Sequence, residues 1–212
     1  MHTYIFLSGI LVMTYFMVIA KRLPSLISSF RWQSLFLFLI TISLAIEEKE
    51  LALYVVAGLI FILKVMLIPH FLLRIIKKIK INENLGFFMN PQLSLFVALI
   101  FTYLSYVFTF KVMSLIDKVQ AASFALSLCV TLLGLFIMVF RIKALAQIIG
   151  LLVMENGLFL TAVTMCKGLP FIVELAMFLD IFISVIILGV FVHRINALFT
   201  HIDVNKLDNL RG

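Results

Sequence analysis

The sequence predicts an all-α integral membrane protein of about seven transmembrane helices, with the N-terminus outside and the C-terminus in the cytoplasm. Hydrophobic residues make up 64% of the 212 residues and charged residues only 13%. The mean hydropathy is +1.23, so the chain is far more apolar than an average soluble domain. Apolar runs of about 20 residues, the length of a membrane-crossing helix, recur along the whole chain. They lack the period-two alternation of barrel strands, so helices are expected.

Each apolar run is expected to form one helix. The seven predicted spans are 3–20, 26–46, 51–76, 92–110, 120–140, 144–166 and 171–193. No basic residue precedes the first run, whereas Lys21 and Arg22 follow it, so a retained helix is expected there rather than a cleaved signal. The longest connection, around Lys77 to Pro91, is too short for a soluble domain.

The orientation follows from the basic residues in alternate loops, which favour the cytoplasmic side. One side carries eleven of them, namely Lys21, Arg22, Arg74, Lys77, Lys78, Lys80, Arg141, Lys143, Arg194, Lys206 and Arg211. The other side carries four, namely Lys49, Lys111, Lys118 and Lys167. The net charge of +7 is therefore largely topological, and no nucleic-acid partner is predicted.

Three ionisable residues lie near the middle of predicted spans: Lys64, Glu155 and Asp180. A charge at the centre of a bilayer costs about 2.5–3.5 kcal/mol, so such residues usually face the interior of a bundle or a neighbouring protein, where they pair or carry protons. We therefore predict that these three residues form a proton relay. The alternative is a structural ion pair, for instance between Lys64 and Glu155, that holds two helices together.

Three other residues are possible accessories to this relay. His70 follows Pro69, which can distort the helix and let water or the imidazole approach Lys64. Glu174 lies near the outer end of the last span, and Asn156 directly follows Glu155 in VMENGLFL. Gln147, Thr161 and Ser184 are further polar side chains that can hold water near the relay, although such residues also serve helix packing.

The sequence predicts no cofactor in this chain. Cys129 and Cys166 are the only cysteines, and they suggest neither a disulfide nor a metal site. There is no Cys or His cluster for an iron–sulfur centre, a haem or zinc, no glycine-rich phosphate loop, and no nucleophile beside a plausible base. No catalytic residue is predicted.

The segment FRIKALAQIIGLLVMENGLFLTAV resembles the hydrogenase-4 component E family, membrane subunits of hydrogenase and formate hydrogenlyase complexes related to respiratory complex I. Four more stretches carry the resemblance in the same order: KRLPSLISSFRWQSL, FILKVMLIPHF, VELAMFLDIFISVIIL and IDVNKLDNLRG. The resemblance implies membrane partners similar to the antiporter-like subunits and the H subunit of complex I. It also implies a nickel–iron hydrogenase arm reached indirectly, and the cytoplasmic (inner) membrane of a bacterium or archaeon.

From about residue 120 the chain also resembles subunit K of complex I and the C subunit of multisubunit cation/proton antiporters. The first membrane glutamate of subunit K corresponds to Leu152, and Glu155 lies about one helical turn further on, on nearly the same face. The second glutamate corresponds to Asp180 or a neighbour. The resemblance therefore implies a pair of membrane carboxylates, with the first displaced along its helix.

This resemblance suggests three parts: an N-terminal three-helix unit over 1–90, a connecting helix and loop over 91–119, and a subunit K-like unit with its tail over 120–212. The predicted function is proton or Na⁺ translocation coupled to redox chemistry elsewhere in the complex. A purely structural subunit is the main alternative. A stand-alone transporter or a seven-helix receptor ranks below both, because the loops are short and Pro69 is the only sign of a discontinuous helix.

Overall fold

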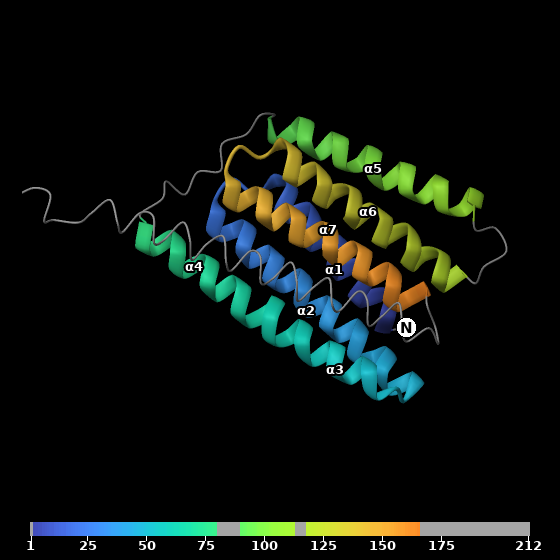
Figure 1. Cartoon of the computed structure of the whole chain (residues 1–212). Helices are drawn as coiled ribbons and strands as arrows, with labels where there is room; N and C mark the ends of the chain where they lie inside the picture. The colour runs from blue at the N-terminus through green and yellow to red at the C-terminus, as the bar shows by residue number, and fades with distance from the viewer. Residues whose placement is uncertain (1, 80–89, 113–117, 166–212) are drawn as a thin grey trace, which may run out of the picture. The chain divides into compact units, whose positions relative to one another are not determined.

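The computed structural model describes residues 2–79, 90–112 and 118–165, and every structural statement below concerns these residues (Figure 1). They all lie in one compact unit, Met1–Met177. The predicted span at 171–193, with Glu174, Asp180 and Ser184, lies outside the described residues.

The described residues form helices, and short turns join α1 to α2, α2 to α3 and α6 to α7 (Figure 1). The helices are α1 (His2–Ile19), α2 (Leu23–Glu48), α3 (Leu51–Ile60), the π-helix η1 (Phe61–Leu67), α4 (Ile68–Ile79), α5 (Pro91–Val112), α6 (Lys118–Phe140) and α7 (Ala144–Met165). Helices are thus confirmed at six of the seven predicted positions, with α3, η1 and α4 following one another as the third. Five of the six are long and apolar enough to cross a membrane, and α1 is a shorter apolar helix.

The turn between α2 and α3 is set by the backbone of Lys49. This residue has a left-handed conformation with φ of 56°, and its N–H donates to the carbonyl of Ala45. A left-handed residue directly after a helix is a common way to end it. The turn is therefore tight, and it returns the chain as α3 alongside α2.

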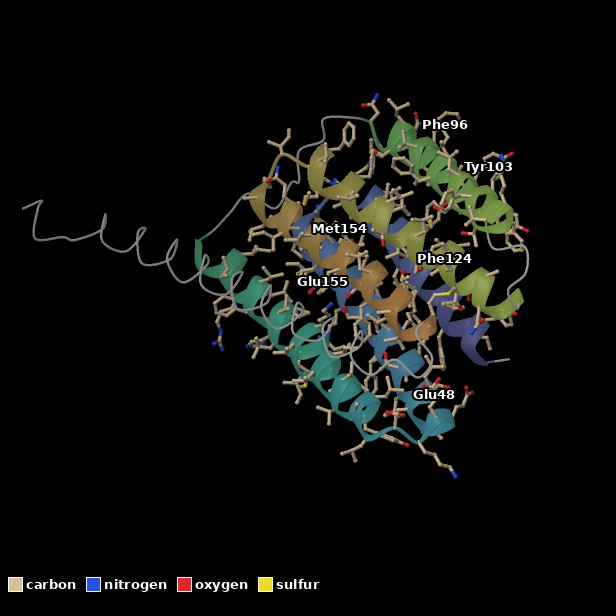
Figure 2. All side chains as sticks on the ribbon, turned by 45° about the vertical axis from the view of Figure 1, so that its right-hand side comes forward. Glu48, Phe96, Tyr103, Phe124, Met154 and Glu155 are labelled. Atoms are coloured by element: carbon tan, nitrogen blue, oxygen red, sulfur yellow. The ribbon has the colours of Figure 1, made fainter. Side chains whose placement is uncertain are left out.

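Helix α5 presents a broad apolar face. Phe96 and Tyr103 are 60% and 68% exposed, and Figure 2 shows both on the outer side of α5. The buried side of α5 is made of small or hydroxyl residues, namely Ser94, Ala98, Ser105 and Thr109. This distribution, with large apolar groups outside and small groups inside, suits a helix that faces lipid or a neighbouring membrane protein.

Helices α6 and α7 approach one another closely through glycines. A Cβ added to Gly150 would lie 2.5 Å from the backbone nitrogen of Met138, and one added to Gly157 would lie 2.6 Å from that of Thr131. The backbones can approach this closely only because neither glycine has a side chain. Small residues serve the same purpose at many helix contacts in membranes.

The turn between α6 and α7 is tied to the end of α1 by Arg141. Its Nη2 donates to the carbonyls of Met17 and Val18, at 3.0 and 2.7 Å. These carbonyls belong to the last turn of α1, where a cation also complements the helix dipole. Burial lowers the pKa of Arg141 to about 10, so the guanidinium remains charged at neutral pH.

We expect Arg141→Gln to lower the free energy of unfolding by roughly 2 kcal/mol, because hydrogen bonds to a charged group contribute more than neutral ones. Thermal unfolding of the full chain in detergent measures this loss. Arg22→Gln is the matched control, since Arg22 is exposed at the start of α2 and makes no side-chain capping bond. An equal loss in the two variants would show that total charge, and not the bonds to α1, is responsible.

Candidate functional site: a buried polar network

Lys64 and Glu155, two of the predicted relay residues, lie next to one another inside the bundle. Lys64 comes from η1 and Glu155 from α7, and Nζ lies 3.7 Å from Oε2 of Glu155. Lys64 is fully buried and Glu155 is 7% exposed, and Figure 2 shows Glu155 in the interior. The ion pair considered from the sequence is therefore present.

Asn156 bonds to Lys64 and joins it to α2. Lys64 Nζ donates to Asn156 Oδ1 at 2.8 Å. The amide nitrogen of Asn156 then donates to Gln33 Oε1 at 3.1 Å and to Ser34 Oγ at 3.3 Å. A lysine can only donate, so it fixes which end of the Asn156 amide faces it. Asn156, one of the predicted accessory residues, thus links Lys64 of η1 to Gln33 and Ser34 of α2.

The network continues from Gln33 to α1. Gln33 Nε2 donates to Thr14 Oγ1 at 2.8 Å, and Thr14 donates to the carbonyl of Ile10 at 2.7 Å. From Lys64 to Ile10 every donor therefore points the same way, and bonds aligned in this manner polarise and strengthen one another. The series stabilises the positive charge of Lys64 by orienting amide and hydroxyl dipoles towards it.

Helix α7 has two different faces around Glu155 and Asn156, which explains the VMENGLFL segment. With about 100° between successive residues, Gly150, Met154 and Gly157 share one face, and Glu155 and Asn156 lie on the opposite one. The glycine face packs against α6, while Asn156 bonds to η1 and α2. The close contact with α6 therefore holds the polar pair against Lys64.

Lys64 lies within a π-helical turn. The N–H of Ile68 donates to the carbonyl of Leu63, five residues earlier, and Pro69 follows with no N–H to donate. The distortion expected at Pro69 thus occurs as a π-helix just before it. π-Helical turns are rare in proteins, and those that do occur are often found at functional sites.

The structure does not bring His70 into this network. His70 is exposed on α4, and it lines a surface cavity with Arg31.

Two of the suggested water-holding residues also bond elsewhere: Gln147 donates to the carbonyl of Arg141 at 2.9 Å, and Thr161 donates to Ser127 Oγ at 2.8 Å. Their roles in the structure are a turn and the α6–α7 contact.

Sequence reasoning missed Thr14, Gln33 and Ser34. Gln33 could have been identified from the sequence, because a side-chain amide within an apolar span needs a hydrogen-bond partner just as a charge needs a counter-charge. Serine and threonine give little signal, since their hydroxyls can bond to the preceding turn of their own helix. Within the described ranges, no three His, Cys, Asp or Glu side chains come close enough to hold a metal ion.

These features define a multi-pass membrane protein with a buried ion pair in a hydrogen-bonded network. Hydrogenase-4 component E of Escherichia coli K12 is 28% identical to it over 210 residues, which are 97% of this chain and 96% of that protein. Hydrogenase-4 component E of Shigella flexneri shows the same figures. Uncharacterized protein Rv0085 of Mycobacterium tuberculosis is 28% identical over 208 residues, covering 97% and 94% of the two chains.

The resemblance to hydrogenase-4 component E is thus confirmed over nearly the full length of both proteins. No family model matches the chain, and no solved structure matches it.

Proposed function

We propose that this chain is a membrane subunit of a complex-I-like hydrogenase or formate hydrogenlyase assembly, in which its buried charges take part in translocating protons or Na⁺. The apolar helices support membrane residence, and the name of the full-length relatives supports the hydrogenase setting. The partners are then the antiporter-like and H-like membrane subunits of such an assembly, with a nickel–iron arm carrying the redox chemistry. The location is the cytoplasmic membrane of a bacterium or archaeon.

The proposed topology has seven spans, with the N-terminus outside and the C-terminus in the cytoplasm. The Arg141 bonds to the last turn of α1 support it, because they bring two basic segments, 21–22 and 141–143, to one end of the helices. This is what a shared cytoplasmic side requires. We also retain the division into 1–90, 91–119 and 120–212 as part of the proposal.

The Lys64–Glu155 contact is the observation that carries the translocation proposal. An ion pair within apolar spans is costly, and charges there usually serve ion pathways. Lys64 is held by Asn156 at 2.8 Å, whereas its contact with Glu155 is longer at 3.7 Å. We infer that Lys64 is the fixed charge and Glu155 the group that takes up and releases a proton.

In this mechanism the protonation of Glu155 changes the local field. An ionised Glu155 contributes a negative charge 3.7 Å from Lys64, and protonation of Glu155 removes that charge. Charges interact strongly in a medium of low polarity, so this change alters the field at other ionisable groups of the relay. We propose Asp180, which lies outside the described residues, as the next group. The proton moves on when an adjacent site becomes the better acceptor. Glu174 is the proposed accessory towards the outside.

The test is Glu155→Gln and Asp180→Asn in the assembled complex, with proton translocation and hydrogen production measured separately. We expect each substitution to lower translocation by roughly tenfold or more, in line with the loss of a proton-transferring group, while hydrogen production continues. Glu48→Gln is the matched control, because Glu48 is exposed at the end of α2. Normal translocation in both test variants would overturn the relay.

A purely structural subunit is the second candidate. The geometry that favours it is the series of bonds from Lys64 through Asn156 and Gln33 to Thr14, which joins the helices of the N-terminal part to α7. Under this alternative, Glu155→Gln leaves translocation intact, and substitutions within the network change assembly alone. The two candidates thus predict opposite results for the same variant.

A further inference from the structure

A groove beside Arg31 lies between α2 and the third span, on the outer surface. One cavity of about 550 Å³ is lined by Arg31 with Ile62, Met66, Leu67, His70, Phe71 and Leu73. A second, of about 420 Å³, is lined by Arg31 with Ser28, Trp32, Leu35, Phe61, Val65 and Met66. Because Arg31 and Met66 line both cavities, we treat them as one groove and call it the Arg31 groove.

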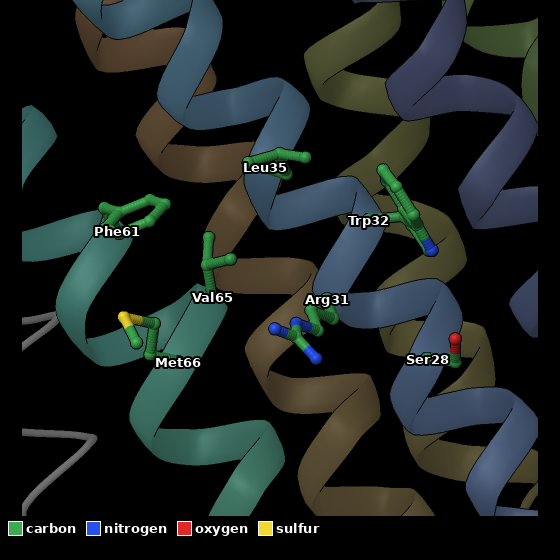
Figure 3. A pocket seen from close by; sticks show the side chains of 7 residues that line it. All are labelled: Ser28, Arg31, Trp32, Leu35, Phe61, Val65 and Met66. Atoms are coloured by element: carbon green, nitrogen blue, oxygen red, sulfur yellow. The ribbon is translucent and has the colours of Figure 1, made fainter.

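The groove has a cationic side chain above an apolar floor. Figure 3 shows Arg31 extending from α2 towards Val65 and Met66 of η1, with Trp32 also on α2. Among the described residues that line the two cavities, none is acidic. An exposed guanidinium on an apolar surface favours an anion, and a phosphate suits the fork of an arginine particularly well.

The depth of Arg31 fits the head group of a lipid. Arg31 lies eight residues beyond Leu23, the first residue of α2, which is about 12 Å along the helix axis. Its long side chain can reach the interface from there. His70 lies six residues before Ile76, the end of the candidate span. The exposed Arg74 follows His70 by one turn, so further basic groups lie towards the same end.

Trp32 lies at nearly the same depth along α2 as Arg31. It is 52% exposed beside Arg31, and tryptophans are enriched where the hydrocarbon meets the head groups. Below it, the apolar floor offers contacts for acyl chains. Basic pockets between membrane helices are recognised sites for acidic lipid head groups.

From this arrangement we propose that the Arg31 groove binds an anionic phospholipid. The phosphate contacts Arg31, with His70 beside it, and the acyl chains lie against η1 and α4. This site is separate from the buried network, because neither Lys64 nor Glu155 lines the two cavities. It does not depend on the proposed translocation.

The test uses Trp32, which is the only tryptophan of the chain. The full chain is reconstituted in vesicles that mix brominated phosphatidylglycerol with unlabelled phosphatidylcholine, and in the reverse-labelled mixtures. Bromine quenches the fluorescence of an adjacent tryptophan, so the two series give the preference of the groove for either lipid. We expect phosphatidylglycerol to be favoured by roughly fivefold or more.

Three variants define the cause of this preference. Arg31→Gln should lower the preference for phosphatidylglycerol over phosphatidylcholine to a ratio close to one. Arg31→Lys should keep most of this preference because the positive charge remains. The control Arg22→Gln removes an exposed arginine at the start of α2 and should leave the preference unchanged. Equal quenching by both lipids in the unaltered chain would overturn the proposal, and so would an unchanged preference in Arg31→Gln. Quenching by neither lipid would show the groove closed to lipid and would also overturn it.

Discussion

Lys64→Met should destabilise the chain by roughly 3 kcal/mol at neutral pH, because removing one member of a buried ion pair removes the attraction that offsets the burial of the other charge. Lys64 is fully buried and contacts both Asn156 and Glu155, so methionine cannot replace either contact. The measurement is thermal unfolding in detergent, together with the amount of chain recovered in assembled complexes.

The double variant Lys64→Met/Glu155→Met identifies the reason for this loss. The double variant also removes the carboxylate that has lost its contact with Lys64, and pairs in direct contact commonly show coupling of about 0.5–3 kcal/mol. We therefore expect the double variant to be more stable than Lys64→Met, although Asn156 still loses its donor. Strictly additive losses would contradict a direct interaction between Lys64 and Glu155.

Gly150→Ala and Gly157→Ala should each destabilise the chain by about 3 kcal/mol or more, since inserted atoms in a close-packed interior force shifts of their neighbours. In both cases the added methyl would meet the backbone of α6, which has no alternative rotamer. The nearest backbone atom of α6 would be the Met138 nitrogen at 2.5 Å for Gly150 and the Thr131 nitrogen at 2.6 Å for Gly157. The midpoint of thermal unfolding in detergent measures the effect.

Gly58→Ala is the matched control for these substitutions. Gly58 also lies within a helix, but no atom lies within 4 Å of a Cβ added there. Alanine is the better helix former by about 1 kcal/mol, so this variant should be as stable as the unaltered chain or slightly more so. A similar loss at all three glycines would show that steric contact between α6 and α7 is not the cause.

The sequence predicted the helices well because span length and apolar composition are strong local signals. It located six helices and singled out Lys64, Glu155 and Asn156, because a polar group in an apolar span is conspicuous. Pairing was harder to predict. Depth alone did not distinguish a relay from an ion pair, and the 3.7 Å contact of Lys64 with Glu155 depends on the π-helix and on the close approach of α6 and α7.

The sequence did not predict the surroundings of His70 and Arg141, and the reasons are physical. His70 was expected near Lys64 because it follows Pro69, but the side chain lies on the exposed side of α4. Arg141 was counted only as a loop charge that sets orientation, yet the residue is only 4% exposed and its guanidinium binds the end of α1. Contacts of this kind join residues more than a hundred positions apart, so local patterns carry no trace of them.

The most direct test of the proposed relay is infrared difference spectroscopy of the assembled complex during turnover. If Glu155 takes up and releases a proton, a carboxyl band should appear and disappear with turnover in the unaltered complex and should be missing in Glu155→Gln. The Glu48→Gln complex should retain the band. If the unaltered and Glu155→Gln complexes give the same carboxyl bands while both turn over, Glu155 keeps one protonation state and the relay is contradicted.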